Sequence, residues 1–214
     1  MSLREWQAIS KPEEEYIYNA SEKTGGDLWV PFSIGMSIHF LHMKKALDYA
    51  QIGPHDKLVY CAINMETDMR RRGNDLVNRK KIIQTLSYNG INNVYQPPVI
   101  YYNELPKYKF VISPEGNGID CHRHYEALMA GCIPIVEHNP LIEDKYKGCP
   151  ILYTTDYSEI TLEFLEKKYL EMLDTIYDFS CLFLSTHSSE IQTQIKENGN
   201  YWGQRCYHAK WYLF

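Results

Sequence analysis

The sequence predicts an α/β fold in which a Rossmann-like parallel sheet is flanked by helices. From residue 57 onward, short apolar runs alternate with longer segments of helical periodicity. Glycine and proline separate these segments, for example at Gly53-Pro54 and at Asn89-Gly90. Strands that alternate with helices form right-handed βαβ units, and such units assemble into a parallel sheet.

Five short apolar runs are predicted to be strands. The run Leu58–Ile63 is continuous and apolar, as expected for a strand that is buried on both faces of a sheet. In a parallel sheet the carboxyl ends of the strands meet at one edge, and ligands bind there. The loops after Ile63, Ser113 and Val136 are therefore the expected location of a site. The predicted strands are residues 58–63, 93–96, 109–113, 132–136 and 150–153.

Helical segments fill the intervals between these strands. The segments 37–50 and 75–88 have helical periodicity, and Gly131 is the expected C-terminal cap of a helix over 122–130. Thr161 is the expected N-cap of a long helix. Residues 103–107 are predicted to form one helical turn, and 180–214 to be helical and aromatic. The side chains expected to face inward are Leu76, Ile82, Ile83 and Leu86 in 75–88, and Leu162, Leu165, Tyr169, Met172 and Ile176 in the long helix.

The composition is typical of a globular domain. The chain has 214 residues, of which 44% are hydrophobic and 23% charged, and its formal net charge is −5. This charge argues against broad nucleic-acid binding, which requires a basic surface. No apolar run reaches the roughly 18 residues of a membrane span, and the first residues lack the apolar core of a signal peptide. The six cysteines include no Cys-x-x-Cys pair, so we expect reduced thiols and a cytoplasmic location.

The loop after the third predicted strand has the most informative pattern, Ser113-Pro-Glu-Gly-Asn-Gly-Ile-Asp-Cys-His-Arg-His-Tyr-Glu126. Its glycines allow the backbone to approach a ligand closely. The helix that follows favours an anion at its start, and Arg123 can donate paired hydrogen bonds to phosphate. Glu126 lies on the same helix face, where a carboxylate suits ribose hydroxyls. The alternative is a glycine turn followed by a surface Arg–Glu pair.

A basic segment follows the first predicted strand. It contains Arg70, Arg71, Arg72, Arg79, Lys80 and Lys81. A solvated helix face would account for most of these charges. Arg79 is the best candidate for a ligand contact, because it lies near the start of the predicted helix.

Other kinds of site fit the pattern less well. The dinucleotide fingerprint requires a third glycine where this chain has Cys121, and an acidic residue where it has Gln96-Pro97-Pro98. The pairs His39/His42 and His122/His124 have no cysteine or carboxylate partner at ligand spacing, so no metal site is predicted.

The segment 109–136 resembles the donor-site signature of exostosin-like glycosyltransferases, and more closely that of small viral and microbial relatives. The Asn…Thr…Arg stretch of such proteins is matched by Asn64, Thr67, Asn78 and Arg79. The similarity covers about residues 57–185. It implies the C-terminal half of a GT-B fold, a nucleoside-diphosphate sugar as donor substrate, and neither a metal ion nor another cofactor.

The resemblance also implies roles for individual residues. Arg123 and Glu126 would belong to the donor site, and the loop would line the pyrophosphate with Ser113, Gly116, Asn117 and Gly118. An inverting enzyme also needs a general base. The candidates are Glu115 and Asp120, with Glu66 and Asp68 after them; Asp120 is also a candidate N-cap. Candidates for stacking on a sugar ring are Tyr101, Tyr102, Trp202 and Trp211, with packing in the core as the favoured alternative.

The expected reaction is transfer of a hexose to a hydroxyl group of a glycan or another acceptor. Residues 1–56 are fewer than the roughly 100 of an ordinary first GT-B domain. We therefore expect a short N-terminal extension and a nucleotide-sugar-binding domain over 57–214. The acceptor region would come from a reduced segment, a second copy, a partner chain or the rest of a longer protein. Two alternatives are a binding module without turnover and an unrelated Rossmann-like enzyme, such as a methyltransferase.

Overall fold

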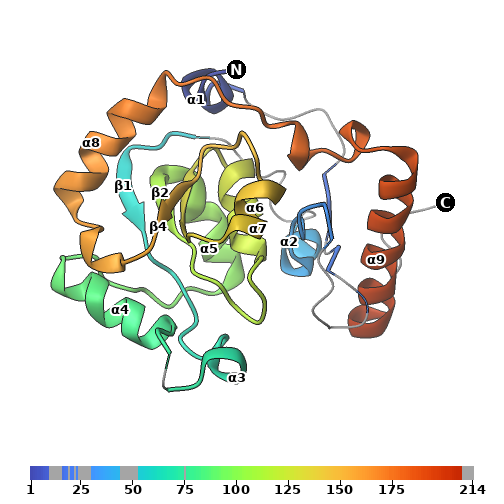
Figure 1. The fold of residues 1–214 in the computed structure, drawn as a ribbon, viewed down its shortest axis with the longest axis horizontal. Helices are drawn as coiled ribbons and strands as arrows, with labels where there is room; N and C mark the ends of the chain where they lie inside the picture. The colour runs from blue at the N-terminus through green and yellow to red at the C-terminus, as the bar shows by residue number, and fades with distance from the viewer. Residues whose placement is uncertain are drawn as a thin grey trace.

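A parallel sheet lies at the centre of the computed structural model, and helices surround it (Figure 1). The structure describes residues 1–9, 16–18, 20, 21, 23, 30–43, 53–74 and 76–208. Within this part of the chain the sheet has four strands: β1 (Lys57–Tyr60), β2 (Tyr108–Ile112), β3 (Ile133–Glu137) and β4 (Leu152–Thr154). The predicted α/β class with a parallel, Rossmann-like sheet is therefore confirmed.

The four strands lie side by side in the order in which they occur along the chain. The pairs Val59–Phe110, Ile112–Ile135 and Val136–Tyr153 are in register, and every pairing is parallel. The connections run through α5 (Pro98–Glu104), α6 (His122–Met129) and α7 (Pro140–Lys145). All the strands therefore end at one edge of the sheet, as the sequence predicts.

The predicted strand 93–96 does not form. Residues 91–97 have no regular secondary structure, although the Val94 amide donates to the Cys61 carbonyl at 2.9 Å. The side chain of Asn93 takes the place of a strand neighbour: its Oδ1 accepts from the Ile63 amide at 2.8 Å, and its Nδ2 donates to the Ile63 carbonyl at 3.1 Å. Because the side chain satisfies both backbone groups, no ladder continues here.

The helix predicted over 75–88 begins later, at Arg79. Helix α4 (Arg79–Tyr88) is capped by Asn78, whose side chain accepts from the Lys81 amide. The prediction that Leu76 faces inward is wrong, since it is 59% exposed. Ile82 and Leu86 are buried as predicted, and Ile83 packs against the core. A short helix that the sequence analysis did not predict, α3 (Met69–Arg72), precedes this one.

Helix α5 is longer than the predicted turn over 103–107. Pro98 begins it, because the fixed backbone angle of proline suits the first helical position. The 3-10 turn η1 (Leu105–Lys107) then leads into β2. The proline pair at 97–98, which directly follows the predicted strand 93–96, therefore starts a helix.

The remaining helices follow the prediction closely. Helix α6 ends before Gly131, whose φ of +77° is the left-handed conformation of a glycine cap. Thr161 caps α8 (Leu162–Leu173) by accepting from the Phe164 amide, and Leu165 and Tyr169 are buried. Met172 packs against the core in a partly buried position. Leu162 and Ile176 are exposed, so their predicted inward orientation is wrong.

The C-terminal part contains the short turns η3 (Ser180–Leu182) and η4 (Leu184–Thr186), followed by α9 (Ser189–Tyr207). The helical prediction for 180–214 is confirmed over α9, whereas residues 180–188 form only the two short turns; the described residues end at 208. Helices α8 and α9 lie on opposite sides of the molecule in Figure 1. The described helices include none that is both long enough and apolar enough to span a membrane.

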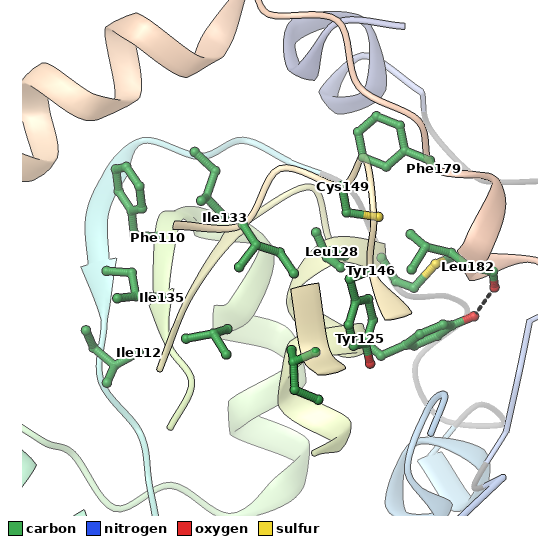
Figure 2. Close-up of a cluster of buried hydrophobic side chains, with 14 of the residues drawn as sticks. Phe110, Ile112, Tyr125, Leu128, Ile133, Ile135, Tyr146, Cys149, Phe179 and Leu182 are labelled. Atoms are coloured by element: carbon green, nitrogen blue, oxygen red, sulfur yellow. Dashed lines mark hydrogen bonds between the residues drawn. The ribbon is translucent and has the colours of Figure 1, made fainter. Parts of the chain in front are cut away.

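One hydrophobic core joins the sheet to helix α6 and to the C-terminal segment. Figure 2 shows the side chains of β2 and β3 next to Tyr125 and Leu128 of α6. The Tyr125 hydroxyl donates to the Leu182 carbonyl, the dashed line in that view. This bond satisfies a polar group in a buried region and fixes the C-terminal segment against α6.

The described N-terminal residues belong to the same core. Helix α1 (Leu3–Gln7) places Trp6 against Phe179, with ring centroids 4.4 Å apart. The Trp6 indole donates to the Leu128 carbonyl at 2.9 Å. Helix α2 (Ile38–Met43) covers part of the predicted helix 37–50, and residues 44–50 lie outside the described part of the chain. The described part of residues 1–56 thus packs onto the sheet domain.

Candidate functional site

A cavity of about 340 Å³ lies beyond the carboxyl end of β1. Its wall combines the loop after β1 with the first residues of α4 and α6, the face of α5, and the start of α2. The volume lies within the range typical of small-molecule sites. The lining residues are Ser37, His39, Ala62, Asn64, Thr67, Arg79, Gln96, Pro98, Tyr101, Tyr102, Cys121, His122, Arg123 and Glu126. Five of the eleven predicted site residues are among them.

Arg123 lies at the cavity wall and has few hydrogen-bond partners there. Its Nη2 donates to the Ala62 carbonyl at 2.9 Å, and its guanidinium carbon lies 5.4 Å from the ring centre of Tyr101. The buried Nε has no hydrogen-bond partner among the described residues. Since a buried donor without a partner is costly, this N–H favours an acceptor in the cavity.

Arg79 lines the same cavity and is held by backbone carbonyl groups. Its side chain donates to Glu115 O at 2.8 Å, Pro114 O at 3.0 Å and Asn64 O at 3.2 Å. The residue is 3% exposed. Burial lowers the pKa of the guanidinium from its ordinary value, and repulsion from Arg123 acts in the same direction. A bound anion would offset both effects.

Neither of these two arginines forms an ion pair with a carboxylate of the described residues. The neighbouring Arg71 and Arg72, by contrast, pair with acidic side chains outside the cavity lining. Arg79 and Arg123 therefore present two incompletely compensated positive charges to one cavity. That arrangement is suited to a dianionic or polyanionic group such as a diphosphate.

Glu126 supplies an acceptor in the same cavity. Its Oε1 accepts from the Tyr102 hydroxyl at 2.5 Å and from the Ser37 amide at 3.4 Å. Burial, followed by the Glu126 charge, raises the pKa of Tyr102 well above its usual value, so Tyr102 stays protonated and donates. Among the described residues nothing donates to Oε2, which leaves this oxygen for a ligand hydroxyl.

Asn64 and Thr67 also line the cavity, at the loop after β1. The Asn64 carbonyl holds Arg79, and its side-chain oxygen accepts from the Glu66 amide at 3.0 Å. The predicted grouping of Asn64, Thr67, Arg79, Arg123 and Glu126 around one cavity is therefore found in the structure.

Six predicted site residues lie outside the cavity lining. Ser113 is completely buried and its hydroxyl is 2.7 Å from His124 Nδ1. Asn117 is exposed, and Gly118 accepts from the Gly116 amide at 2.9 Å. The other three are Glu115, Gly116 and Asp120. The loop thus lies outside the cavity lining. This geometry does not favour direct contact of pyrophosphate with Ser113, Gly116, Asn117 or Gly118.

Glu115 is held in an ion-pair network. Arg71 and Arg72 both donate to its carboxylate, Arg72 also donates to Glu137, and the Glu115 amide donates to Glu137 Oε2 at 2.7 Å. Its side chain is 7% exposed. Because two arginines bind this carboxylate outside the cavity lining, the geometry does not favour Glu115 as the general base.

Asp120 is also fully engaged, and it does not cap α6. Its carboxylate accepts from the Ile34 amide at 3.0 Å, the Tyr146 hydroxyl at 2.8 Å and Lys145 Nζ at 3.2 Å. Cys121 occupies the N-cap position instead and makes no capping bond. The expectation that Asp120 caps the helix is therefore wrong: the residue ties the loop to α7 and to the N-terminal segment.

Gly116 leaves little room for a side chain beside Arg79. A Cβ atom at this position would lie 3.1 Å from Arg79 Nη2, closer than most Cβ contacts, and 3.4 Å from Thr67 Cγ2. At Gly118 a Cβ would meet only the Asp120 carbonyl, at 3.7 Å. The sequence analysis predicted that these glycines admit a ligand; at Gly116 the structure shows that the glycine admits an arginine.

Replacing Gly116 with alanine should therefore weaken anion binding, because the new methyl group displaces Arg79. We expect roughly a tenfold rise in the dissociation constant, about 1.4 kcal/mol, for pyrophosphate measured by calorimetry. Gly118→Ala is the matched control and should bind as the unchanged protein does. Equal affinities for the two variants would contradict this explanation of Gly116.

Several cavity residues were missed by sequence reasoning. Ser37 and His39 come from a segment that is distant in sequence, and only the tertiary fold brings them to the site. Tyr101 and Tyr102, by contrast, were named from the sequence as stacking candidates. Both line the cavity and are also packed, with ring centroids 5.8 Å apart for Tyr101 and Tyr60 and 5.4 Å apart for Tyr102 and Phe40. Cys121 lines the cavity too, at the position where a dinucleotide fingerprint has glycine.

Among the residues that the structure describes, no group of three or more histidine, cysteine, aspartate and glutamate side chains is placed to hold a metal ion. A comparison of the sequence with models of known protein families finds no match, and a comparison with curated proteins finds none either.

Proposed function

We propose that this chain binds a nucleoside-diphosphate sugar in the cavity beyond β1 and transfers the sugar to an acceptor hydroxyl. The observation that carries the proposal is the pair formed by the buried Arg79 and the partly buried Arg123, which line one cavity without an ion-pair partner among the described residues. The resemblance to exostosin-like glycosyltransferases and to the donor half of a GT-B fold supports it, since it selects the same two residues.

The diphosphate is the part of the donor that these arginines suit best. The Arg123 Nε lacks a partner among the described residues, and the Arg79 guanidinium is held by backbone carbonyls, which compensate its charge incompletely. As the bond to the sugar breaks, negative charge grows on the leaving diphosphate. Two fixed cations at this position stabilise the transition state more than the ground state.

Glu126 suits the hydroxyl groups of the ribose. Tyr102 and the Ser37 amide hold its Oε1, so the carboxylate keeps one orientation in the cavity. A fixed carboxylate accepts hydrogen bonds from neighbouring hydroxyls without the entropy cost of ordering a free side chain. The aromatic rings of Tyr101 and Tyr102 give the wall an apolar surface beside it.

A binding module without turnover is the second candidate. The specific observation in its favour is that the two main candidates for the general base, Glu115 and Asp120, are both engaged by cationic partners outside the cavity lining. In the transferase proposal, the general base would therefore come from the acceptor side, supplied by a second copy or a partner chain.

Turnover assays with labelled donors separate the two candidates. The protein is incubated with UDP-, GDP- and ADP-hexoses labelled in the sugar, with and without simple glycan acceptors. Transfer or slow donor hydrolysis that is lost in Arg123→Ala supports the transferase. Binding without release of labelled sugar supports the binding module. Binding of S-adenosylmethionine or NAD in place of these donors would overturn both.

A further inference from the structure

Cys121 sits at the entrance of helix α6 and lines the same cavity. Its Sγ lies 3.4 Å from His124 Nδ1 and 3.7 Å from His124 Nε2, and it is partly buried. The Ser113 hydroxyl lies 2.7 Å from His124 Nδ1 and 3.9 Å from the sulfur. The thiol, the imidazole and the hydroxyl therefore form one cluster, and the thiol is its cavity-lining member.

The charges around this thiol favour its ionised form. Burial opposes ionisation, but His124, Arg79 and Arg123 outweigh it and lower the pKa of Cys121 to about 7. Burial likewise works against the charged imidazole, yet the thiolate raises the pKa of His124. Position at a helix N-terminus acts in the same direction as these cations. The remaining titratable groups near the cluster are Asp120 beside His124, and Tyr146 and Tyr157 near Cys121.

The other described cysteines have different surroundings. Cys61 and Cys132 are buried, and burial raises the pKa of both thiols, that of Cys61 to about 12. Cys149 and Cys181 face each other at 3.4 Å. Cys206 lies exposed on α9 and is absent from the cavity lining. Cys206 is therefore an internal control for simple accessibility.

We propose that Cys121 is a redox-modification site, at which a hydroperoxide that enters the cavity oxidises the thiolate to a sulfenic acid. The thiolate attacks one oxygen of hydrogen peroxide, so that an S–O bond forms while the O–O bond breaks. Sulfur loses two electrons and the peroxide gains them. The leaving hydroxide takes the proton of the His124 imidazolium and departs as water, and Cys121 is left as a neutral sulfenic acid.

Oxidation changes the electrostatics of the anion site. The thiolate beside Arg79 and Arg123 becomes a neutral sulfenic acid, so a negative charge next to the two cations is lost. The modified protein is therefore expected to bind anions more tightly. This consequence rests on the proposed anion site, whereas the reactivity of the thiol does not.

The test is peroxide treatment of the full chain in the presence of dimedone, which traps sulfenic acids, followed by peptide mass spectrometry. We expect Cys121 to be labelled at least about tenfold faster than Cys206 at pH 7, with a rate that rises through about pH 7. Inorganic pyrophosphate should slow labelling of Cys121 alone. In His124→Gln the rate at Cys121 should fall about tenfold and its pH inflection should move upward.

Circular dichroism of the variants shows whether a slower labelling rate results from loss of fold. The Cys121→Ser variant identifies the label that belongs to Cys121. Labelling of Cys121 no faster than that of Cys206 in the unchanged protein would overturn the proposal, as would an unaltered rate and pH profile in folded His124→Gln. Rapid labelling that pyrophosphate does not slow would leave the thiol assignment standing and contradict only the anion site.

Discussion

Replacement of Arg123 with alanine is expected to abolish sugar transfer and to weaken nucleoside-diphosphate binding at least about a hundredfold. Charge-assisted hydrogen bonds contribute about 1.5–3 kcal/mol each, and each 1.4 kcal/mol is a tenfold change in affinity. Arg123 has a buried Nε without a partner and only one backbone acceptor, the Ala62 carbonyl, in the described part of the chain. Calorimetric titration with the nucleoside diphosphate measures the loss.

The matched control is Arg70→Ala. Arg70 belongs to the same basic segment and is exposed outside the cavity lining, so its loss should leave affinity within about twofold of the unchanged protein. Arg123→Lys keeps the charge but not the planar donor geometry and should fall between the two. Full affinity in Arg123→Ala, or an equal loss in Arg70→Ala, would contradict the assigned role.

Replacement of Glu115 with alanine is expected to lower the free energy of unfolding by about 3–5 kcal/mol, the usual effect of removing one partner of a buried ion pair. Arg72 is 9% exposed at its side chain and would lose one of its carboxylate partners, while Arg71 would lose its own. Urea denaturation measures the change, and Glu166→Ala, an exposed position on α8, should stay within about 0.5 kcal/mol.

A second substitution at this position, Glu115→Gln, tests whether Glu115 is a structural or a catalytic residue. The structural account predicts that sugar transfer by the folded fraction of Glu115→Gln survives, because the residue lies outside the cavity lining. An unchanged free energy of unfolding together with a loss of sugar transfer would favour the general-base role instead. That result would also require the Arg71–Glu115–Arg72 network to open when the acceptor binds.

The parallel sheet could be predicted because its central strands are continuous apolar runs flanked by helices. The sequence 93–96 was misassigned because apolar alternation cannot reveal that the Asn93 side chain satisfies both backbone groups of Ile63. The start of α4 was misplaced because the helical periodicity begins at residue 75, whereas the residue that caps the helix through its side chain is Asn78.

Part of the site could also be predicted from the order of strands and helices. Residues that follow β1 or begin α4 and α6 must reach one edge of a parallel sheet, so Arg79, Arg123 and Glu126 were placed correctly at a shared cavity. Loop residues such as Glu115 and Asp120 were not, because their partners Arg72 and Tyr146 come from other elements. Ser37 reaches the cavity through a tertiary contact that no local pattern encodes.

The most direct test of the central claim is thermal unfolding of the protein with a panel of nucleotides. The panel is UDP, GDP, ADP, CMP, NAD and S-adenosylmethionine, each measured with the unchanged protein and with Arg123→Ala. A ligand at about 100 times its dissociation constant adds roughly 2.7 kcal/mol of stability. We predict this stabilisation for one nucleoside diphosphate and its absence in Arg123→Ala. No stabilisation by any diphosphate, or the same stabilisation in both proteins, would contradict the claim that Arg79 and Arg123 form a diphosphate site.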